Sequence, residues 1–218
     1  MFEMTELFDL SHSLAGEYLG SFHYPWEALG GIKNLILTLG ETLGQDYRQI
    51  APQVWVHETA VIAPSAYLGA PCIIGPGTEV RHCAFIRGSA LVGAGCVVGN
   101  SVELKNVILF DNVQVPHYNY VGDSILGYKS HMGAGSLTSN VKSDKTLVVV
   151  KDGKEQIATG LKKFGAILGD HVEVGCYSVL TPGTVIGTHT NVYPTSCVRG
   201  VVPANSIWKT GGVVVKKV

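Results

Sequence analysis

The most regular feature of the sequence is an aliphatic residue at every sixth position over much of the chain. The fifteen positions are Val56, Ile62, Leu68, Ile74, Val80, Ile86, Val92, Val98, Leu104, Leu168, Val174, Leu180, Ile186, Val192 and Val198. Four residues after each lies a small or β-branched residue: Ala60, Ala66, Cys72, Thr78, Ala84, Ala90, Cys96, Val102, Ile108, Val172, Ser178, Thr184, Thr190, Ser196 and Val202. A period near 3.6 would indicate a helix and a period of two a strand. A period of six predicts a parallel β-helix, with three hexads in each triangular coil of about 18 residues.

The hexad pattern is disturbed in the middle of the chain. Between Leu104 and Met132 the step alternates between five and six, and over residues 138–163 the pattern stops. Within this stretch Asp152-Gly153 lies between two apolar runs, which is a strong hairpin signal. We therefore expect a β-hairpin excursion that leaves the prism near Asn140 and returns near Phe164. Long loops on rigid scaffolds often carry function, and an inert insertion is the alternative.

Residues 1–52 lack the hexad pattern and predict a helical lead segment, followed by a β-helix domain over residues 53–218. Leu7, Leu10 and Leu14 have helical spacing, and Pro25 is suited to the first turn of a second helix. We expect two helices joined by residues 18–24. Their apolar faces need cover, either from the prism or from a neighbouring subunit. The last coil is expected to end near Pro203, before a basic tail.

Composition narrows the classes of function. The net charge is −1 with 15% charged residues, which argues against a nucleic-acid partner. No apolar run reaches the length of a membrane span, and the first residues do not resemble an export signal, so we expect a cytoplasmic protein without a membrane partner. Of the five cysteines, Cys72 and Cys96 fall on the small interior position and are expected to be buried thiols.

Two cations have the same hexad position one coil apart. Arg87 follows Ile86 and Lys105 follows Leu104, so the two side chains should be neighbours on one face, about 4.8 Å apart. They would repel each other unless an anion lay between them, and splaying into solvent is the alternative. His117, in the disturbed stretch His117-Tyr118-Asn119-Tyr120-Val121-Gly122-Asp123, is the candidate catalytic residue.

This stretch resembles the hexapeptide-repeat acyltransferases, and within them the C-terminal acetyltransferase domain of the bifunctional N-acetylglucosamine-1-phosphate uridyltransferases. Residues 117–123 match that domain's His-Leu-Thr-Tyr-Leu-Gly-Asp segment, and residues 131–136 match its Asn-Ile-Gly-Ala-Gly-Thr segment. The resemblance implies an all-β, left-handed parallel β-helix of hexapeptide repeats. The glycine-rich segment of the uridyltransferase half is missing from the sequence, so a stand-alone acetyltransferase is expected.

The resemblance also implies roles for single residues. His117 falls on the general base, and Arg87 and Lys105 fall on residues that bind the sugar phosphate or its uridylyl product. The residues that fall on substrate-sugar contacts are Tyr120, Asn140 and His131, the last of which replaces an asparagine. Ala134 is expected at the acyl-CoA or oxyanion position within Gly133-Ala134-Gly135, and Cys176 beside the acyl-CoA channel. Val141 departs from the tyrosine of the family pattern.

The expected reaction is acetyl transfer from acetyl-CoA, as co-substrate, to the amine of a phosphorylated or nucleotide-linked amino sugar. No metal is required for it. The resemblance implies a homotrimer with the acyl-CoA site between neighbouring prisms. One alternative is a non-catalytic module that binds a sugar phosphate or sugar nucleotide and partners a separate nucleotidyltransferase. A second is a hexapeptide-repeat carbonic anhydrase, which needs a histidine five residues after the first, where Gly122 stands.

Overall fold

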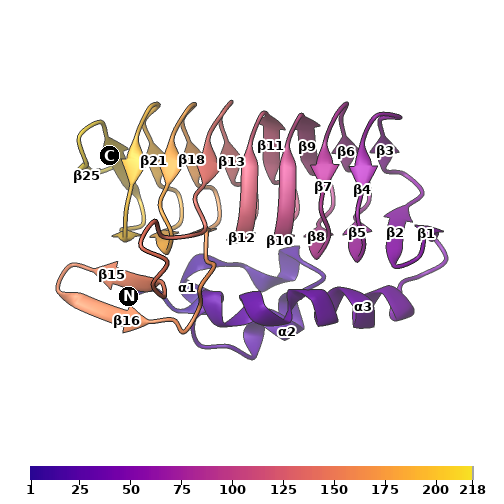
Figure 1. Cartoon of the computed structure of the whole chain (residues 1–218), viewed down its shortest axis with the longest axis horizontal. Coiled ribbons are helices and arrows are strands. Elements are labelled where there is room, and N and C mark those ends of the chain that lie inside the picture. The colour runs from indigo at the N-terminus through magenta and orange to yellow at the C-terminus, as the bar shows by residue number, and fades with distance from the viewer. Residues whose placement is uncertain (218) are drawn as a thin grey trace.

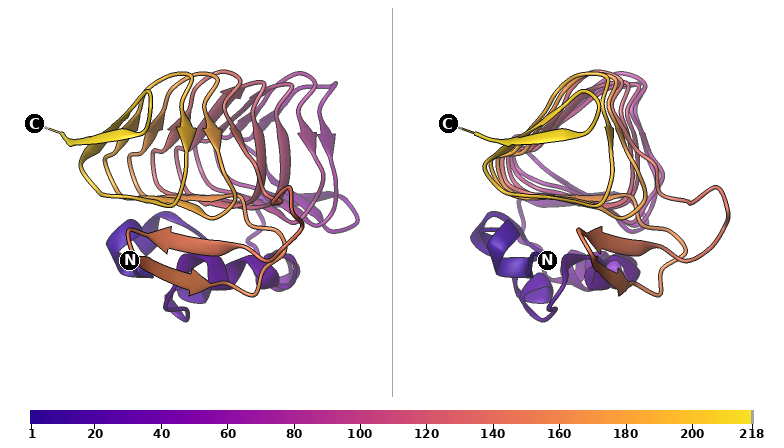
Figure 2. Two further views of the ribbon diagram at one scale, coloured as in Figure 1. Left: turned by 60° about the vertical axis from the view of Figure 1, so that its left-hand side comes forward. Right: turned by 90° about the vertical axis from the view of Figure 1, so that its left-hand side faces the viewer.

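The computed structural model describes residues 1–217. Most of these residues wind into a parallel β-helix with a triangular cross-section, and the coils stack from β2 to β24 (Figures 1 and 2). The prediction of a parallel β-helix is therefore confirmed. Strands on adjacent coils pair in parallel, as in Glu79↔Val97 and Val80↔Val98.

Three faces make up the prism. The first face contains β3 (Val61–Ile62), β6 (Glu79–Val80), β9 (Val97–Asn100), β11 (Gln114–His117), β13 (His131–Met132), β18 (Glu173–Val174), β21 (Asn191–Val192) and β24 (Ser206–Lys209). The second contains β4 (Tyr67–Leu68), β7 (Phe85–Ile86), β14 (Leu137–Thr138), β19 (Val179–Leu180) and β22 (Cys197–Val198). The third contains β2 (Val54–His57), β5 (Cys72–Ile74), β8 (Ala90–Val92), β17 (Ala166–Leu168), β20 (Thr184–Ile186) and β23 (Val201–Val202). The long strands β10 (Glu103–Leu109) and β12 (Tyr120–Leu126) pass round the corner from the second face to the third.

The hexad aliphatic residues fill the inside of the prism. Val80, Ile86 and Val98 are fully buried, and so are Cys72 and Cys96, as expected. Burial raises the pKa of both thiols to about 12, so they stay protonated as small apolar groups.

One interior residue differs from the sequence expectation. Val107 pairs with Ala90 and therefore takes the small interior position, whereas Ile108 pairs with the outward-facing Leu91. The cause is the five-residue step from Leu104 to Leu109, which places the small position one residue earlier in the sequence than a six-residue step would.

The third face carries an outward column of apolar side chains that the hexad analysis did not identify. The parallel registers align Trp55, Ile73, Leu91, Ile108, Ile125, Ile167, Val185 and Val201. Six of these, from Ile73 to Val185, are at most 1% exposed. The N-terminal helices cover this face, and Figure 2 shows them along one side of the triangle. The chain's own prism therefore buries the helical face.

The lead segment is more broken than the expected pair of helices. Its elements are α1 (Met4–Leu7), η1 (Leu10–His12), α2 (Gly16–Gly20), η2 (Pro25–Gly31), α3 (Ile32–Thr42) and β1 (Tyr47–Ala51), the η elements being 3-10 helices. The prediction of one continuous first helix from the leucine spacing is wrong. Asp9 accepts a hydrogen bond from the Ser11 N–H and caps a 3-10 turn, which interrupts the helix. Pro25 does begin a helical stretch. β1 pairs antiparallel with β2 and ends the helical part before residue 52.

Gly40 allows α3 to lie close to the prism. A Cβ atom at this position would be only 2.3 Å from the Trp55 ring. Glycine in a helix interior costs stability relative to alanine, so its presence here reflects the close approach of the helix to the first coil.

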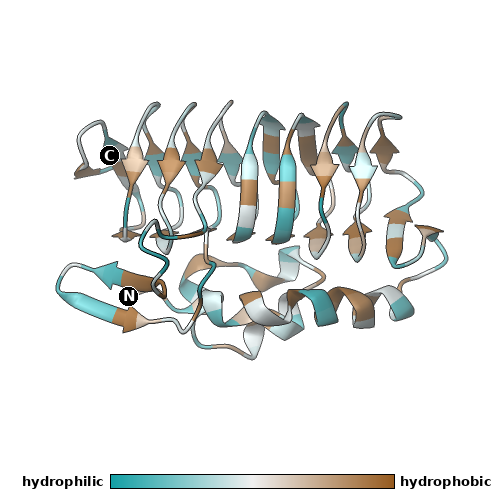
Figure 3. Ribbon diagram, in the orientation of Figure 1, coloured by the Kyte–Doolittle hydropathy of each residue, from teal (hydrophilic) through white to brown (hydrophobic). Residues whose placement is uncertain are grey.

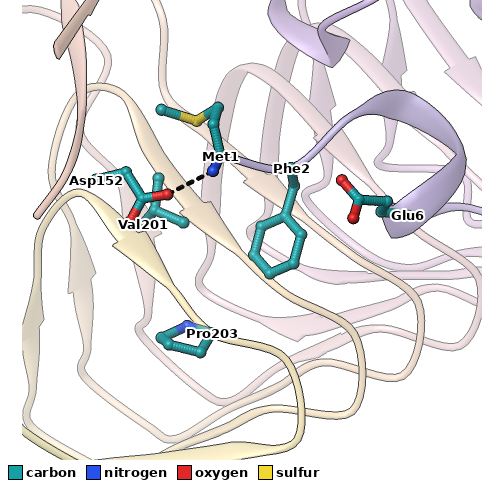
Figure 4. Close-up of a pocket in the computed structure, with 6 residues that line it drawn as sticks. All are labelled: Met1, Phe2, Glu6, Asp152, Val201 and Pro203. Atoms are coloured by element: carbon teal, nitrogen blue, oxygen red, sulfur yellow. Dashed lines mark ion pairs between the residues drawn. The ribbon is translucent and has the colours of Figure 1, made fainter. Parts of the chain in front are cut away.

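The excursion forms the expected hairpin, with β15 (Val149–Asp152) paired antiparallel to β16 (Glu155–Ala158). Its tip is hydrophilic and its other end hydrophobic (Figure 3), and Val148 and Val150 are fully buried. The hairpin folds back beside the helices on the covered side of the prism (Figure 2). The Met1 amino group is 2.7 Å from Asp152 Oδ2, beside a cavity of about 270 Å³ that Phe2 and Pro203 also line (Figure 4).

The coils continue a little beyond Pro203. β24 (Ser206–Lys209) still pairs in parallel with β21, and β25 (Val213–Lys216) then turns back antiparallel to β24. None of the helices within residues 1–217 has the length and apolar character needed to span a membrane.

Candidate functional site

The two stacked cations lie on the second face. Phe85 and Ile86 pair with Glu103 and Leu104, which places Arg87 next to Lys105 on adjacent coils. Lys105 in turn pairs with Gly122 on the following coil. The register thus confirms the spatial relationship that the 18-residue spacing predicts.

Each of these cations has a carboxylate partner within the chain. Arg87 Nη1 is 2.8 Å from Glu103 Oε1, and this hydrogen bond raises the pKa of the guanidinium. Lys105 Nζ is 2.8 Å from Asp123 Oδ1. The repulsion expected from the sequence is therefore offset inside the protein, and an incoming anion must share or replace these carboxylates.

Asp123 is the centre of a buried polar cluster. Its side chain is 5% exposed, and besides Lys105 it accepts hydrogen bonds from Asn106 Nδ2 at 3.0 Å and Asn140 Nδ2 at 2.6 Å. Asn140 Nδ2 also lies 3.1 Å from Tyr120 Oη. Burial, followed by the charge of Asp123, raises the pKa of Tyr120 above its ordinary value, so the phenol stays protonated. We call these five residues the Asp123 cluster.

His117 lies at the corner between the first and second faces, at the end of β11. Its side chain is exposed, and its carbonyl accepts the Gly135 N–H at 3.0 Å. Its own N–H donates to Asn119 Oδ1 at 3.1 Å. The buried Asn119 amide also donates to the Gly133 and Ser136 carbonyls, so it fixes the corner on which the imidazole stands. The sequence places Asn119 in the matched segment but carries no signal for this structural role.

His117 and the stacked cations lie at opposite edges of the second face. The histidine precedes β12 at the corner, whereas Lys105 aligns with Gly122, the third residue of that strand. Within residues 1–217 no hydrogen bond or ion pair joins the imidazole to Arg87 or Lys105. His117 therefore stands where the second face begins, and Tyr120, three residues later, extends its hydroxyl into the Asp123 cluster on that face.

Of the three backbone N–H groups in the turn Gly133-Ala134-Gly135, only one is free, among the described residues, to stabilise an oxyanion. The Gly133 N–H donates to the Val174 carbonyl at 2.7 Å, and the Gly135 N–H donates to His117. In the described part of the chain, the Ala134 N–H has no acceptor. Cys176 is exposed and lies beside Ala134 on the next coil, as the pairing of Met132 with Val174 requires.

His131 lies away from the Asp123 cluster. It is on the first face, where it pairs with Gln114 and Glu173. Its Nδ1 is 2.8 Å from Glu173 Oε2. The second face thus brings together four of the predicted site residues around the carboxylates of Glu103 and Asp123: Arg87, Lys105, Tyr120 and Asn140. His131 lies on the neighbouring first face.

Histidines also meet at another corner, where His171 and His189 stack with ring centroids 4.6 Å apart. Burial lowers the pKa of His171, and the neighbouring His189 lowers it further. Over residues 1–217, no group of three or more His, Cys, Asp or Glu side chains is arranged to hold a metal ion.

Comparison with known proteins gives one family and several relatives. The family model described as the GMPPB C-terminal domain matches residues 79–210. A bifunctional sugar-1-phosphate nucleotidylyltransferase/acetyltransferase of Sulfurisphaera tokodaii is 32% identical over 106 residues, covering 49% of this chain and 26% of that protein. The bifunctional protein GlmU of Methanococcus maripaludis is 30% identical over 204 residues, covering 92% of this chain and 49% of that protein. The chain thus spans about half or less of the length of these curated relatives.

Among solved structures, a hexapeptide transferase family protein from Anaplasma phagocytophilum has a TM-score of 0.42 at 14% identity. The match covers 75% of this chain and 78% of that one.

Proposed function

The chain belongs to the GMPPB C-terminal domain family, and from that premise and the site geometry we propose that it is an acetyltransferase. The donor is acetyl-CoA and the acceptor is the amine of a phosphorylated or nucleotide-linked amino sugar. The observation that supports this most directly is the second face itself, which begins at the corner that carries His117 and leads to Arg87, Lys105 and the Asp123 cluster.

The chemistry is direct attack of a neutral amine on the thioester carbonyl. The amine nitrogen forms a bond to the acetyl carbon, its proton passes to His117, and the carbon–sulfur bond breaks to release the CoA thiolate. Histidine has an ordinary pKa of ~6.5 and accepts a proton readily at neutral pH. Its exposed position at the corner suits a base that must reach an incoming substrate.

The Ala134 N–H is our candidate for stabilising the tetrahedral oxyanion. It is held by the turn and is the one N–H of Gly133-Ala134-Gly135 with no acceptor among residues 1–217. A fixed donor of this kind stabilises charge that develops only in the transition state. Cys176, beside it on the next coil, would then border the path of the acyl-CoA.

The acceptor is held by the other end of the face. Tyr120 and Asn140 offer a hydroxyl and an amide at the mouth of the Asp123 cluster, and both suit sugar hydroxyls. Arg87 is about half exposed, so for an acceptor that is a simple sugar phosphate it can exchange Glu103 for a phosphate oxygen at little cost. His131 would contact substrate only if the bound sugar reached the first face.

A screen of acceptors against acetyl-CoA tests the proposal. Release of free thiol would be followed with amino-sugar phosphates, nucleotide-linked amino sugars and their unphosphorylated forms. Thiol release with at least one phosphorylated amine, and much less with its unphosphorylated form, is expected. No release with any member of the panel would contradict acetyl transfer.

A non-catalytic binding module is the second candidate, and one observation favours it. In the described residues the His117 imidazole has no hydrogen-bond partner to orient it, whereas catalytic bases are commonly held by one. A homotrimer would resolve this, because a neighbouring prism could supply the partner; closed cyclic assemblies are common. Light scattering on the purified chain gives the oligomeric state, and an active monomer would contradict a shared site.

A further inference from the structure

The excursion and the prism enclose a cleft beyond the Asp123 cluster. Its volume is about 630 Å³. Three cations from separate segments line it: Lys142 at the start of the excursion, Lys151 on β15, and Arg199 after β22. No carboxylate is among its lining residues. A cleft with this lining favours an anionic ligand.

The cleft lies on the same column as Arg87 and Lys105. After Lys105 and Gly122, the registers of β12, β14, β19 and β22 continue the column through Ser139, Thr181 and Arg199. Four steps of about 4.8 Å place the backbone of Arg199 roughly 19 Å from that of Lys105. Ser139 lines the cleft and is followed directly by Asn140 of the Asp123 cluster, so the two sites are continuous.

Among the cations of the column and the cleft, those that have no carboxylate partner in the described chain lie in the cleft. Arg87 and Lys105 are each paired with a carboxylate, and Lys142 is 3.2 Å from Asp144 Oδ2. Lys151 and Arg199 are exposed, and neither makes an ion pair within residues 1–217. A ligand with more than one negative charge would therefore find uncompensated partners here rather than at Lys105.

Two glycines hold the hairpin against the prism and so shape the cleft. Gly200 has φ +67°, and a Cβ atom there would be 2.6 Å from the Lys151 carbonyl oxygen. Gly183 has φ +81°, and a Cβ atom there would be 2.7 Å from a Val148 methyl group. Both positions need glycine for conformation and for space. The side of the cleft that carries Lys151 is thus seated on the wall that carries Arg199.

We propose that this cleft binds a nucleoside diphosphate. The diphosphate would meet Lys151, Arg199 and Lys142, and the base or ribose would pack on the apolar lining of Val141, Val149 and Pro182. This inference rests on the proposed function, which supplies the amino-sugar acceptor. The cleft makes that acceptor a nucleoside-diphosphate-linked amino sugar. The sugar lies at Tyr120 and Asn140, and the nucleotide lies beneath the hairpin.

A nucleoside diphosphate occurs in two relevant ligands, the nucleotide-linked acceptor and coenzyme A. The geometry assigns the cleft to the acceptor. Ala134 and Cys176, which border the expected path of acyl-CoA, precede β14 and β19, whereas Ser139 and Thr181 of the cleft follow those strands. The two ligands would then approach the second face from opposite edges.

Calorimetric titration of the full chain, without acetyl-CoA, tests the inference. The probes are UDP, GDP, uridine, inorganic phosphate and CoA. UDP or GDP is expected to bind, and uridine and phosphate are expected to bind at least tenfold more weakly. Lys151→Gln and Arg199→Gln should each weaken diphosphate binding about fivefold, whereas Lys154→Gln, on the same hairpin but outside the cleft, should not.

Several outcomes would overturn the inference. They are the absence of UDP or GDP binding, and UDP binding by Arg199→Gln that equals that of the parent chain. Phosphate binding as tight as UDP binding would also contradict it. So would a loss of CoA affinity in Arg199→Gln as large as the loss of UDP affinity. The same titration on His117→Asn separates this inference from the proposed function. Diphosphate binding should be unchanged in that variant, so failure of acetyl transfer and failure of the cleft give different results.

Discussion

Asn140 Nδ2 donates to Asp123 Oδ2 at 2.6 Å, and this bond joins the start of the excursion to the wall of the prism. The other oxygen of Asp123 accepts from Lys105 at 2.8 Å. One carboxylate thus holds the Asn140 amide and a cation of the stacked pair in fixed positions. This arrangement explains why a buried acid lies beside the candidate acceptor site.

Asp123→Asn should destabilise the protein by roughly 1–3 kcal/mol, because Lys105 loses its charged partner and one amide donor loses an acceptor. Asparagine tolerates the left-handed conformation that Asp123 adopts, with φ +49°, so the backbone should be kept. Chemical denaturation measures the change. Asp144→Asn, an exposed carboxylate in the excursion, is the matched control and should change stability far less. Equal stability of the two variants would show that the Asp123 cluster is unimportant for folding.

Gly40→Ala should destabilise the protein, although alanine is more favourable than glycine in a helix by about 1 kcal/mol. The new methyl group would meet the Trp55 ring at 2.3 Å, and overpacking of this kind costs ~1–3 kcal/mol. Gly44→Ala has open space around the new Cβ atom and should change stability by less than about 1 kcal/mol. Thermal melting of both variants gives the comparison. A melting temperature for Gly40→Ala at or above that of Gly44→Ala would contradict the packing of α3 on the first coil.

Thiol reactivity should divide the five cysteines into two classes. Cys83, Cys176 and Cys197 are exposed, whereas Cys72 and Cys96 are buried with pKa values raised to about 12 by desolvation. At pH 8 the native chain should react with an alkylating reagent at the first three only, and mass spectrometry of the digested protein identifies the sites. After denaturation all five should react. Rapid native labelling of Cys72 or Cys96 would contradict the position of these thiols inside the prism.

The stacked histidines predict a dependence of stability on pH. The pKa of His171 is lowered in the folded state, first by burial and then by His189, with smaller contributions from Lys129 and His12, while Asp170 opposes the shift. Folding therefore favours the neutral imidazole, and this contribution is present above the unfolded pKa of ~6.5 and is lost as pH falls below it. The melting temperature should fall between pH 7.5 and pH 5.5.

His171→Asn provides the control for this effect, because asparagine accepts the left-handed φ of +59° at this position. The fall in melting temperature over the same pH range should be smaller in this variant than in the parent chain. An identical fall in both proteins would exclude His171 as its source.

The period of six was sufficient to predict the prism, because each coil must place one aliphatic residue inside every face. The same pattern gave the stacking of Arg87 on Lys105, since residues one coil apart pair directly. It could not show that Glu103 and Asp123 neutralise them, because side-chain direction at a bent strand is not periodic.

Two further features differ in whether the sequence pattern could reveal them. The outward column from Ile73 to Val185 was detectable in principle as apolar residues next to the hexad positions, and it would have identified the face that the helices cover. The cleft was not detectable, because it depends on where the hairpin is seated. Only the fold brings Lys151 and Arg199 to the same cleft.

The most direct measurement of the central claim compares the parent chain with His117→Ala in acetyl transfer to the best phosphorylated acceptor. A general base contributes about 10²–10⁴-fold in rate, so kcat should fall by at least ~10²-fold while calorimetric affinity for the acceptor stays within about twofold. Unchanged turnover in His117→Ala would contradict the account of this site as an acetyltransferase with a histidine base.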